Sequence, residues 1–296
     1  MSFVNADCMD YLKKFEDNHF DIAIVDPPYF SGPEKRRYYG RKNSPIGVKR
    51  LYEELSEWEV PAKEYFDELL RISKNQIIFG VNYFDYPFGP GRIVWDKVNG
   101  RSSFSDCELA YCSLHDSTRL FRYMWNGMMQ GKSISEGHIQ QGNKKLNEIR
   151  IHPTQKPINL YRWLVQKYAK KGDKILDTHV GSASSLIAFE EAGFEYVGFE
   201  KDPIMFEKAK KRLEKYKNRI PDNFLPISSN EFGDLICLCT QGERIGQIFY
   251  WDHENEWDEE DYFDEFGVQM PEEVKFQNIY LIGKNLYDCF SRMIPV

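Results

Sequence analysis

Long apolar runs are missing from this sequence of 296 residues. None approaches the roughly 18–20 residues that a membrane-spanning helix requires. The first residues, Met1 to Asp7, contain neither a basic region nor an apolar stretch, so they lack the features of a secretory signal. We therefore expect a cytoplasmic protein that makes no membrane contact.

Cysteine is also scarce, with six residues in the chain and no C-x-x-C pair. That number is too low for a disulfide framework in a chain of this length. Cys237 and Cys239 lie two apart within an apolar run, a spacing that places both thiols on one face of a strand. Packing is a more common role there than metal ligation. We therefore expect no structural zinc site and no other metal.

Basic residues are rare in the last quarter of the chain. Residues 221–296 contain 4 basic and 16 acidic residues, whereas residues 1–220 contain 35 basic and 30 acidic residues. The resulting balances of −12 and +5 indicate two domains, in agreement with a prior of roughly 150 residues per domain. Pro221 and turn-forming residues mark the boundary. Only residues 1–220 are suited to approach a polyanion, because phosphates would repel the acidic segment.

Hydrophobic patterning in residues 1–220 predicts an α/β fold, a mostly parallel sheet with helices on both faces. Strands are predicted at residues 20–26, 76–81, 92–97, 108–113, 174–178 and 196–200, with 3–7 as an edge strand. Helices are predicted at residues 9–15, 62–73, 158–169, 184–192 and 203–217. Asp202 is the expected N-cap of the last helix, with Pro203 in its first turn. Poor periodicity between Ser113 and Ile151 predicts a long loop.

The motif Asp26-Pro27-Pro28-Tyr29 directly follows the predicted strand at residues 20–26. Two consecutive prolines form a stiff turn and remove two N–H donors, which leaves the Asp26 carboxylate and the Pro27 carbonyl as an edge rich in acceptors. Such an edge can accept both hydrogens of an exocyclic NH₂ group while the ring of that ligand stacks on Tyr29. A strand-terminating turn with a core tyrosine is an equally acceptable interpretation of this motif alone.

A second strand, at residues 174–178, runs into a turn of small residues, 179–185, and then into a helix. Small residues there allow a ligand to approach the backbone and the helix N-terminus. The strand at 196–200 ends in Glu200, where a carboxylate can accept hydrogen bonds from ribose hydroxyls. The turn lacks the G-x-G-x-x-G spacing, which disfavours a nicotinamide or flavin site. A third stretch, residues 151–157, precedes a helix and on its own indicates only a helix start.

Taken together and in this order, the motifs resemble those of the DNA amino-methyltransferases in which D-P-P-Y precedes the cofactor motif. The family order is D-P-P-Y, a variable target-recognition segment, H-P-T-x-K-P, then D-P-F-x-G-S-G-T-T and a strand ending in an acidic residue. The corresponding residues here are 26–29, 152–157, 177–185 and Glu200, and residues 5–10 resemble the family's G-D-C stretch. The resemblance spans residues 3–217.

The resemblance implies a Rossmann-like fold, S-adenosylmethionine as cofactor and an active site with Asp26, Pro27, Pro28 and Tyr29 as catalytic residues. The cofactor-binding residues that it implies are Asp7, Cys8, Thr154, Lys156, Asp177, His179, Gly181, Ser182, Ser184 and Glu200. Among the departures from the family pattern, His179 replaces the usual phenylalanine and Ala183 replaces a loop glycine. Both departures bear on cofactor affinity.

The resemblance also implies that the target base is flipped out of duplex DNA and held by Asp26, the Pro27 carbonyl and Tyr29 while its amino group is methylated. The motif order favours N6 of adenine, with N4 of cytosine as the alternative. A catalytically weak binding or immunity module is a second alternative, motivated by His179 and Ala183. Family analogy places target recognition at about residues 97–150.

A basic stretch with interspersed tyrosines directly follows the D-P-P-Y motif. Cations and aromatics in this pattern suit phosphate contact beside a flipped base, although a solvated charged loop has the same composition. The DNA-binding residues predicted from it are Arg36, Arg37, Arg41, Lys42, Lys49 and Arg50.

Residues 221–296 are predicted to form a small α+β segment with two β runs and a terminal helix. The stretches G-D-L-x-C-L and G-x-x-x-Y-W-D-H-E resemble the C-terminal half of the SMI1/KNR4 (SUKH) domain. Such domains serve protein binding, so the acidic segment is expected to bind a protein partner rather than DNA. Residues 254–265, which are strongly acidic, equally fit a flexible loop.

Overall fold

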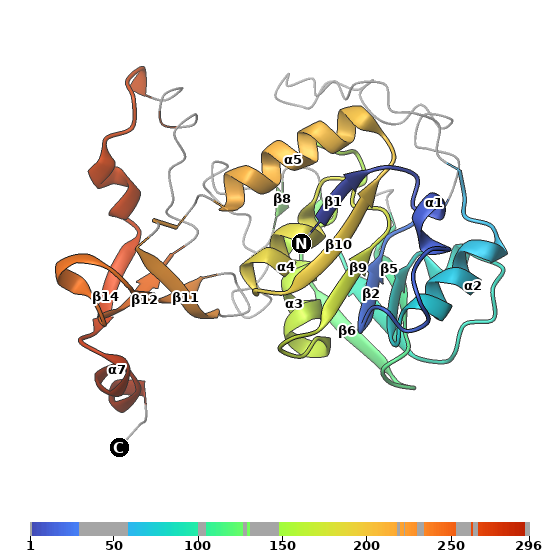
Figure 1. Cartoon of the computed structure of the whole chain (residues 1–296), viewed down its shortest axis with the longest axis horizontal. Helices are drawn as coiled ribbons and strands as arrows, with labels where there is room; N and C mark the ends of the chain where they lie inside the picture. Colours follow the sequence, from blue (N-terminus) through green and yellow to red (C-terminus); the bar gives the residue numbers. More distant parts are fainter. Residues whose placement is uncertain are drawn as a thin grey trace. The chain divides into compact units, whose positions relative to one another are not determined.

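The computed structural model describes residues 2–29, 59–99, 105–126, 129–130, 148–217, 220–221, 223–229, 234–252, 262 and 266–293. The chain divides into two compact units, Met1–Leu213 and Glu214–Val296 (Figure 1). The division lies inside the last helix of the first unit, a few residues before the proline predicted to mark the boundary. Each unit is described by itself.

The first unit is built on an eight-stranded, mostly parallel sheet, as the patterning predicts. Its strands, in spatial order, are β1 (Ser2–Asn5), β10 (Glu195–Glu200), β9 (Lys174–Asp177), β2 (Ile22–Val25), β3 (Gln76–Phe79), β5 (Cys107–Cys112), β4 (Arg92–Asp96) and β6 (Thr118–Arg122). The first five run parallel to one another. β5 is antiparallel to both of its neighbours, and β4 pairs parallel with β6. The edge strand predicted near the N-terminus is β1.

Helices cover both faces of this sheet, so its central strands β2 and β3 are buried along their whole length. On one face, α1 (Met9–Leu12) and α2 (Lys63–Ile72) bury Leu12 and Leu69 against Ala23 and Leu176. On the other face lie α3 (Ile158–Tyr168) and α4 (Ser184–Glu191) (Figure 1). There the Tyr161 ring of α3 contacts Phe79 of β3.

The helix α5 (Pro203–Lys217) has the predicted bounds. The Asp202 side chain accepts a hydrogen bond from the Met205 N–H at 2.9 Å, which is the expected cap. None of the helices in the part of the chain that the structure describes is both long and apolar enough to span a bilayer.

The described part of the stretch predicted as a long loop contains three short strands. Besides β6 they are β7 (Trp125–Asn126) and β8 (Met129–Gln130), which pair with each other. β6 lies at the edge of the sheet and most of its side chains are exposed. It therefore carries no alternating pattern that a sequence reading could detect. The residue pairs of β7 and β8 are too short to produce a pattern at all.

The second unit is a four-stranded antiparallel sheet in chain order. Its strands are β11 (Phe224–Ser229), β12 (Leu235–Cys239), β13 (Ile248–Trp251) and β14 (Ile279–Gly283). Further elements among the described residues of this unit are the 3₁₀ turns η5 (Gly242–Arg244) and η7 (Glu272–Phe276) and the helix α7 (Leu286–Met293). Four strands replace the two predicted β runs. Cys237 and Cys239 lie on one face, as their spacing predicts, and both are in the core.

Candidate active site

The two motifs that the sequence singles out lie at one edge of the large sheet. β2 and β9 are parallel neighbours, with Ala23 paired to Leu176, so both strands end on the same side. Asp26 follows β2, and Asp177 ends β9. Glu200 ends β10, the next strand along. We call this edge, defined by Asp26, Asp177 and Glu200, the carboxyl edge.

Asp26 is held by two donors at this edge. The Tyr29 hydroxyl donates to Asp26 Oδ1 at 2.7 Å, and the Lys156 ammonium hydrogen-bonds Oδ2. Lys156 also donates to the Tyr29 hydroxyl oxygen at 2.8 Å. Pro27 is buried and Pro28 half-buried in the turn between them. Lys156, which family resemblance assigns to cofactor binding, is therefore placed by the structure among the D-P-P-Y residues.

A second carboxylate, Glu108, belongs to the same cluster. Its Oε2 lies 2.9 Å from the Lys156 ammonium and 3.1 Å from the Tyr29 hydroxyl. Its Oε1 pairs with the Lys97 ammonium. Because β5 runs antiparallel to β3, the start of β5 reaches the carboxyl edge, where the parallel strands end. The site thus contains two carboxylates, two ammonium groups and a phenol, most of whose surface is buried.

Burial and pairing act differently on the two carboxylates. Burial would raise the pKa of Glu108, but Lys156 and Lys97 outweigh it and lower that pKa to about 2. For Asp26, burial and the neighbouring Glu108 charge outweigh Lys156, so its pKa is raised. Asp26 is therefore the more basic carboxylate of the cluster. It is the better acceptor for hydrogens on a nitrogen that gains positive charge.

The Tyr29 ring packs closely against its surroundings. It lies parallel to the Tyr83 ring, with centroids 5.2 Å apart and an interplanar angle of 2°. Tyr83 belongs to the 3₁₀ turn η2 (Val81–Tyr83) that follows β3. Gly80 precedes this turn with a φ of 73°, and a Cβ at that position would lie 2.2 Å from the Tyr29 ring. A residue without a side chain is required here to let the ring sit against the backbone.

The turn between β9 and α4 is fixed by hydrogen bonds to buried carboxylates. Asp177 accepts hydrogen bonds from the Ser185 hydroxyl at 2.5 Å and from the His179 N–H at 3.0 Å. Glu200 accepts from the Gly181 N–H at 2.8 Å. Burial raises the pKa of Asp177 and of Glu200 to about 7. A Cβ on Gly181 would meet no atom within 4 Å, so the space beside the turn is open to a ligand.

The other residues implied for cofactor binding surround this turn or precede the first and third helices. Asp7 pairs with Lys201 at 2.9 Å, and buried Cys8 starts α1. His179 is half-buried and contacts the Tyr65 ring edge-on. Desolvation lowers its pKa to about 4, so it is neutral at pH 7. Thr154 hydrogen-bonds His152 at 3.1 Å in the segment before α3.

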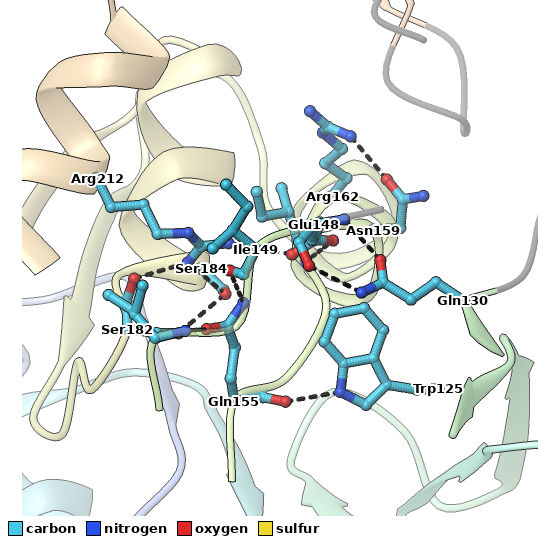
Figure 2. Close-up of polar contacts among 12 residues, drawn as sticks. Trp125, Gln130, Glu148, Ile149, Gln155, Asn159, Arg162, Ser182, Ser184 and Arg212 are labelled. Atoms are coloured by element: carbon cyan, nitrogen blue, oxygen red, sulfur yellow. Dashed lines mark hydrogen bonds and ion pairs between the residues drawn. The ribbon is translucent and has the colours of Figure 1, made fainter. Parts of the chain in front are cut away.

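Two residues of the predicted recognition segment, Trp125 and Gln130, contact the stretch 148–155 that leads into α3. The Trp125 indole N–H of β7 donates to the Gln155 carbonyl at 2.7 Å. The Gln130 amide of β8 donates to the Glu148 carbonyl at 2.8 Å and accepts from the Glu148 N–H at 2.7 Å. Figure 2 shows these residues together with Ser182, Ser184 and Arg212. The predicted DNA-binding residues, Arg36, Arg37, Arg41, Lys42, Lys49 and Arg50, lie outside the described residues.

Sequence reasoning missed Glu108, Lys97 and Tyr83. A charged residue at the start of an otherwise apolar strand is a usable signal, because a buried carboxylate requires a partner. The signal could not name that partner, since Lys156 lies 48 residues away along the chain. Tyr83 gives no local signal of its role.

Comparison with known proteins gives two family matches. Residues 94–211 match the N6/N4 methyltransferase model described as DNA methylase, and residues 159–267 match an SMI1-KNR4 cell-wall model of the SUKH group. The first range begins after the D-P-P-Y motif and includes the turn between β9 and α4. The second extends upstream of residue 221, where the sequence resemblance to this domain was expected to begin.

Curated relatives cover more of the chain. The type II methyltransferase M2.MboI of Moraxella bovis is 25% identical over 269 residues, which is 78% of this chain and 91% of that protein. M.HinfI of Haemophilus influenzae, also a type II methyltransferase, is 21% identical over 290 residues, 86% of this chain and 80% of that protein. A solved structure of an M1.HpyAVI–SAM complex is 18% identical, with a TM-score of 0.42, over 71% of this chain and 98% of that one.

The same kind of enzyme, a DNA methyltransferase, is indicated by the motifs on the carboxyl edge, by the family match and by the curated relatives. Over residues 94–211, and over most of its length in the curated relatives, the chain is similar to DNA methyltransferases of the N6/N4 family.

Proposed function

We propose that the chain methylates the N6 amino group of adenine in DNA, with the base flipped out of the duplex. The observation that carries this proposal is the position of Asp26 on the carboxyl edge, one strand away from the turn that ends at α4. An acceptor for an amino group and a turn suited to a nucleotide-type cofactor therefore follow neighbouring strands at the same edge of the sheet. The order of the motifs supports adenine over cytosine.

Asp26 supplies the acceptors for the target amino group. Its oxygens already accept from Tyr29 and Lys156, but each carboxylate oxygen has a second lone pair. One amino hydrogen can bind Asp26 and the other the Pro27 carbonyl, so the nitrogen lone pair is free to attack. The carboxylate then stabilises the positive charge that develops on this nitrogen. Asp26, the more basic carboxylate of the cluster, also accepts the proton that the methylated nitrogen releases.

Lys156 keeps the Asp26 carboxylate oriented before the base enters. Glu108 holds the Lys156 ammonium from the opposite side, and Lys97 in turn neutralises Glu108. In this chain of pairs every charge has a partner of opposite sign. The pairing is needed because an isolated carboxylate in such a largely buried site would be strongly destabilising. The parallel rings of Tyr29 and Tyr83 provide an aromatic wall for the purine.

S-adenosylmethionine, the cofactor of this family, supplies an electrophilic methyl group on a sulfonium. The residues present fit such a molecule. Glu200 is fixed by the Gly181 and Asp202 N–H groups and retains lone pairs for ribose hydroxyls. His179, in place of the usual phenylalanine, is neutral and packed on Tyr65. It therefore offers an aromatic surface without a charge, as the phenylalanine would.

The test replaces Asp26 by alanine in the full chain and measures methyl transfer to DNA together with cofactor binding. We expect transfer to fall by about a thousandfold, because the acceptor for the developing charge is lost. Cofactor affinity should stay within about twofold, since the turn lies on other strands. Asp21→Asn is the matched control, because Asp21 lies at the opposite end of the same strand and pairs with Lys74. It should retain activity.

The methylated base is identified by digesting the product DNA to nucleosides and separating them by mass. N6-methyladenine is the expected product. N4-methylcytosine would replace the adenine assignment while leaving the mechanism in place. Full activity of the Asp26→Ala variant would refute the mechanism.

We infer that the acidic second unit binds protein rather than DNA. Its balance of −12 charges repels phosphates, and the SMI1-KNR4 match reaches into it.

A further inference from the structure

The turn between β9 and α4, residues 178–183, which we call the cofactor turn, contains a residue in an unfavourable backbone conformation. Ala183, which precedes α4, has φ 64° and ψ 19°, in the left-handed region. A Cβ disfavours this region, which is why glycine usually occupies it. Ala183 is fully buried. Because the family motif has glycine at this position, the surrounding protein must hold the turn in a shape that the sequence itself does not favour.

Arg212 contacts the turn on both sides of Ala183 (Figure 2). Its Nη1 donates to the Ser182 carbonyl at 2.6 Å and to the Ser184 hydroxyl at 2.9 Å. Arg212 comes from α5 and is 92% buried, with 8% of its surface exposed. A guanidinium presents several donors in a rigid plane, so one side chain fixes the residue before and the residue after the strained position.

Glu148 holds the guanidinium in place. Its Oε2 lies 3.0 Å from Arg212 Nη2, and its Oε1 accepts from the Ile158 N–H at the start of α3. The Glu148 backbone is paired in both directions with the Gln130 side chain. The ion pair is buried on both sides, so its geometry is set by α3, α5 and β8 together rather than by solvent.

We propose that Arg212, anchored by Glu148, is a positioning residue for the cofactor: it holds Ala183 in the left-handed conformation and so performs the role that glycine has in the family motif. The proposal rests on the proposed function, in that the turn is taken to bind S-adenosylmethionine. Loss of Arg212 leaves the turn in its binding-competent shape only part of the time. The apparent dissociation constant for S-adenosylmethionine then rises in inverse proportion to the fraction of molecules whose turn has the binding-competent shape.

The experiment measures S-adenosylmethionine binding by calorimetry in four full-length forms: the natural chain, Arg212→Gln, Ala183→Gly and the double variant. Arg212→Gln should weaken binding by about tenfold or more. Ala183→Gly alone should bind at least as tightly as the natural chain, because glycine adopts the conformation without help. The double variant should recover most of the lost affinity. Recovery of affinity in the double variant would show that Arg212 acts through the conformation of the turn, because Ala183→Gly cannot restore stability lost with a merely structural ion pair.

Arg71→Gln is the control. Arg71 also forms an ion-pair network, with Glu68 at 2.7 Å and Asp17 at 2.6 Å, and this network joins α2 to the segment after α1. It should lower the melting temperature without changing cofactor affinity. Should Arg212→Gln not fold, Glu148→Gln replaces it, because this change keeps a side chain of the same size while removing the charge that holds the guanidinium.

Three outcomes decide the proposal. Equal affinity in Arg212→Gln and the natural chain overturns it, and so does a double variant that binds as weakly as Arg212→Gln. Recovery by Ala183→Gly supports it. A natural chain that binds no S-adenosylmethionine would refute the proposed function instead, and this result is distinct because it requires no variant.

Discussion

Glu200 is the residue whose ionisation bears most directly on the proposed cofactor site. Burial raises its pKa to about 7, against an ordinary value near 4.5. A carboxyl whose pKa is higher in the folded than in the unfolded state contributes stability that is complete at low pH. That stability is lost as the pH rises from about 4.5 through about 7. The ionised form, to which the proposed function assigns the hydrogen bonds from ribose, is therefore reached only with a loss of fold stability.

Replacing Glu200 by glutamine should flatten the pH dependence of stability. We expect the melting temperature of the natural chain to fall more between pH 5.5 and pH 8 than that of Glu200→Gln, because the variant has no carboxyl to ionise. Asp177, whose pKa is also about 7, leaves a residual slope in both proteins. The measurement is thermal unfolding without cofactor across this range. Parallel curves for the two proteins would contradict the assignment.

Single residues were predictable from the sequence where a motif fixes their place in the chain. Asp26, Asp177 and Glu200 follow from strand ends, and their proximity follows from parallel pairing. Lys156 shows the limit of this reasoning, since its motif position gave no indication that it contacts Asp26. That contact depends on how the segment before α3 crosses the carboxyl edge, which local propensity does not determine.

At the scale of elements, the turn from β3 into η2 sets the position of Tyr29. Gly80→Ala should displace the Tyr29 ring, because the new Cβ would lie 2.2–2.8 Å from three ring atoms. We expect a strong loss of methyl transfer and destabilisation beyond the roughly 1 kcal/mol that a positive φ imposes on alanine. Urea unfolding and a methyl-transfer assay measure the two effects.

Gly172→Ala is the control for this substitution. Gly172 also has a positive φ, 93°, but a Cβ there meets no atom within 4 Å. It should show the backbone effect alone and retain activity. Similar activities in the two variants would mean that Tyr29 is not held by its contact with Gly80.

The predictable elements are those whose periodicity is imposed by burial. β2, β3 and β9 lie in the sheet centre, where β2 is apolar throughout and β3 and β9 contain the apolar residues 77–79 and 175–176. The helix α5 has a strong start signal. β6 could not be found because most of its side chains are exposed. In the second unit, β11 was missed because it contains Pro226 and shifts register beside it, which obscures the alternation of a regular strand.

At the scale of the whole molecule, the two sequence segments on either side of residue 220 carry opposite charge balances, +5 over residues 1–220 and −12 over residues 221–296. A chain ending at residue 220 retains all of α5. We expect it to bind non-specific DNA about tenfold more tightly than the full chain at low salt, because the repulsive segment is gone. Fluorescence anisotropy with a labelled duplex measures this difference.

Salt provides the control for the truncation. At 1 M salt the screening length is only about 3 Å, so the two chains should bind DNA with the same weak affinity. A difference that persists at high salt would point to a direct contact of the acidic unit. Equal affinities at low salt would mean that the acidic unit does not affect DNA binding.

Because β5 is antiparallel to β4, the connection between these two strands begins and ends at the carboxyl edge. The chain leaves the sheet after Asp96, at the end of β4, and re-enters it at Cys107, at the start of β5. The Lys97 N–H bonds the Asp106 carbonyl at 2.9 Å. Both ends of this connection therefore lie beside the cluster of Asp26, Lys156 and Glu108. Insertions between them lengthen a connection whose ends are already paired, which costs little entropy and leaves the register of every strand unchanged. New contacts to a substrate can be acquired there without rebuilding the catalytic cluster.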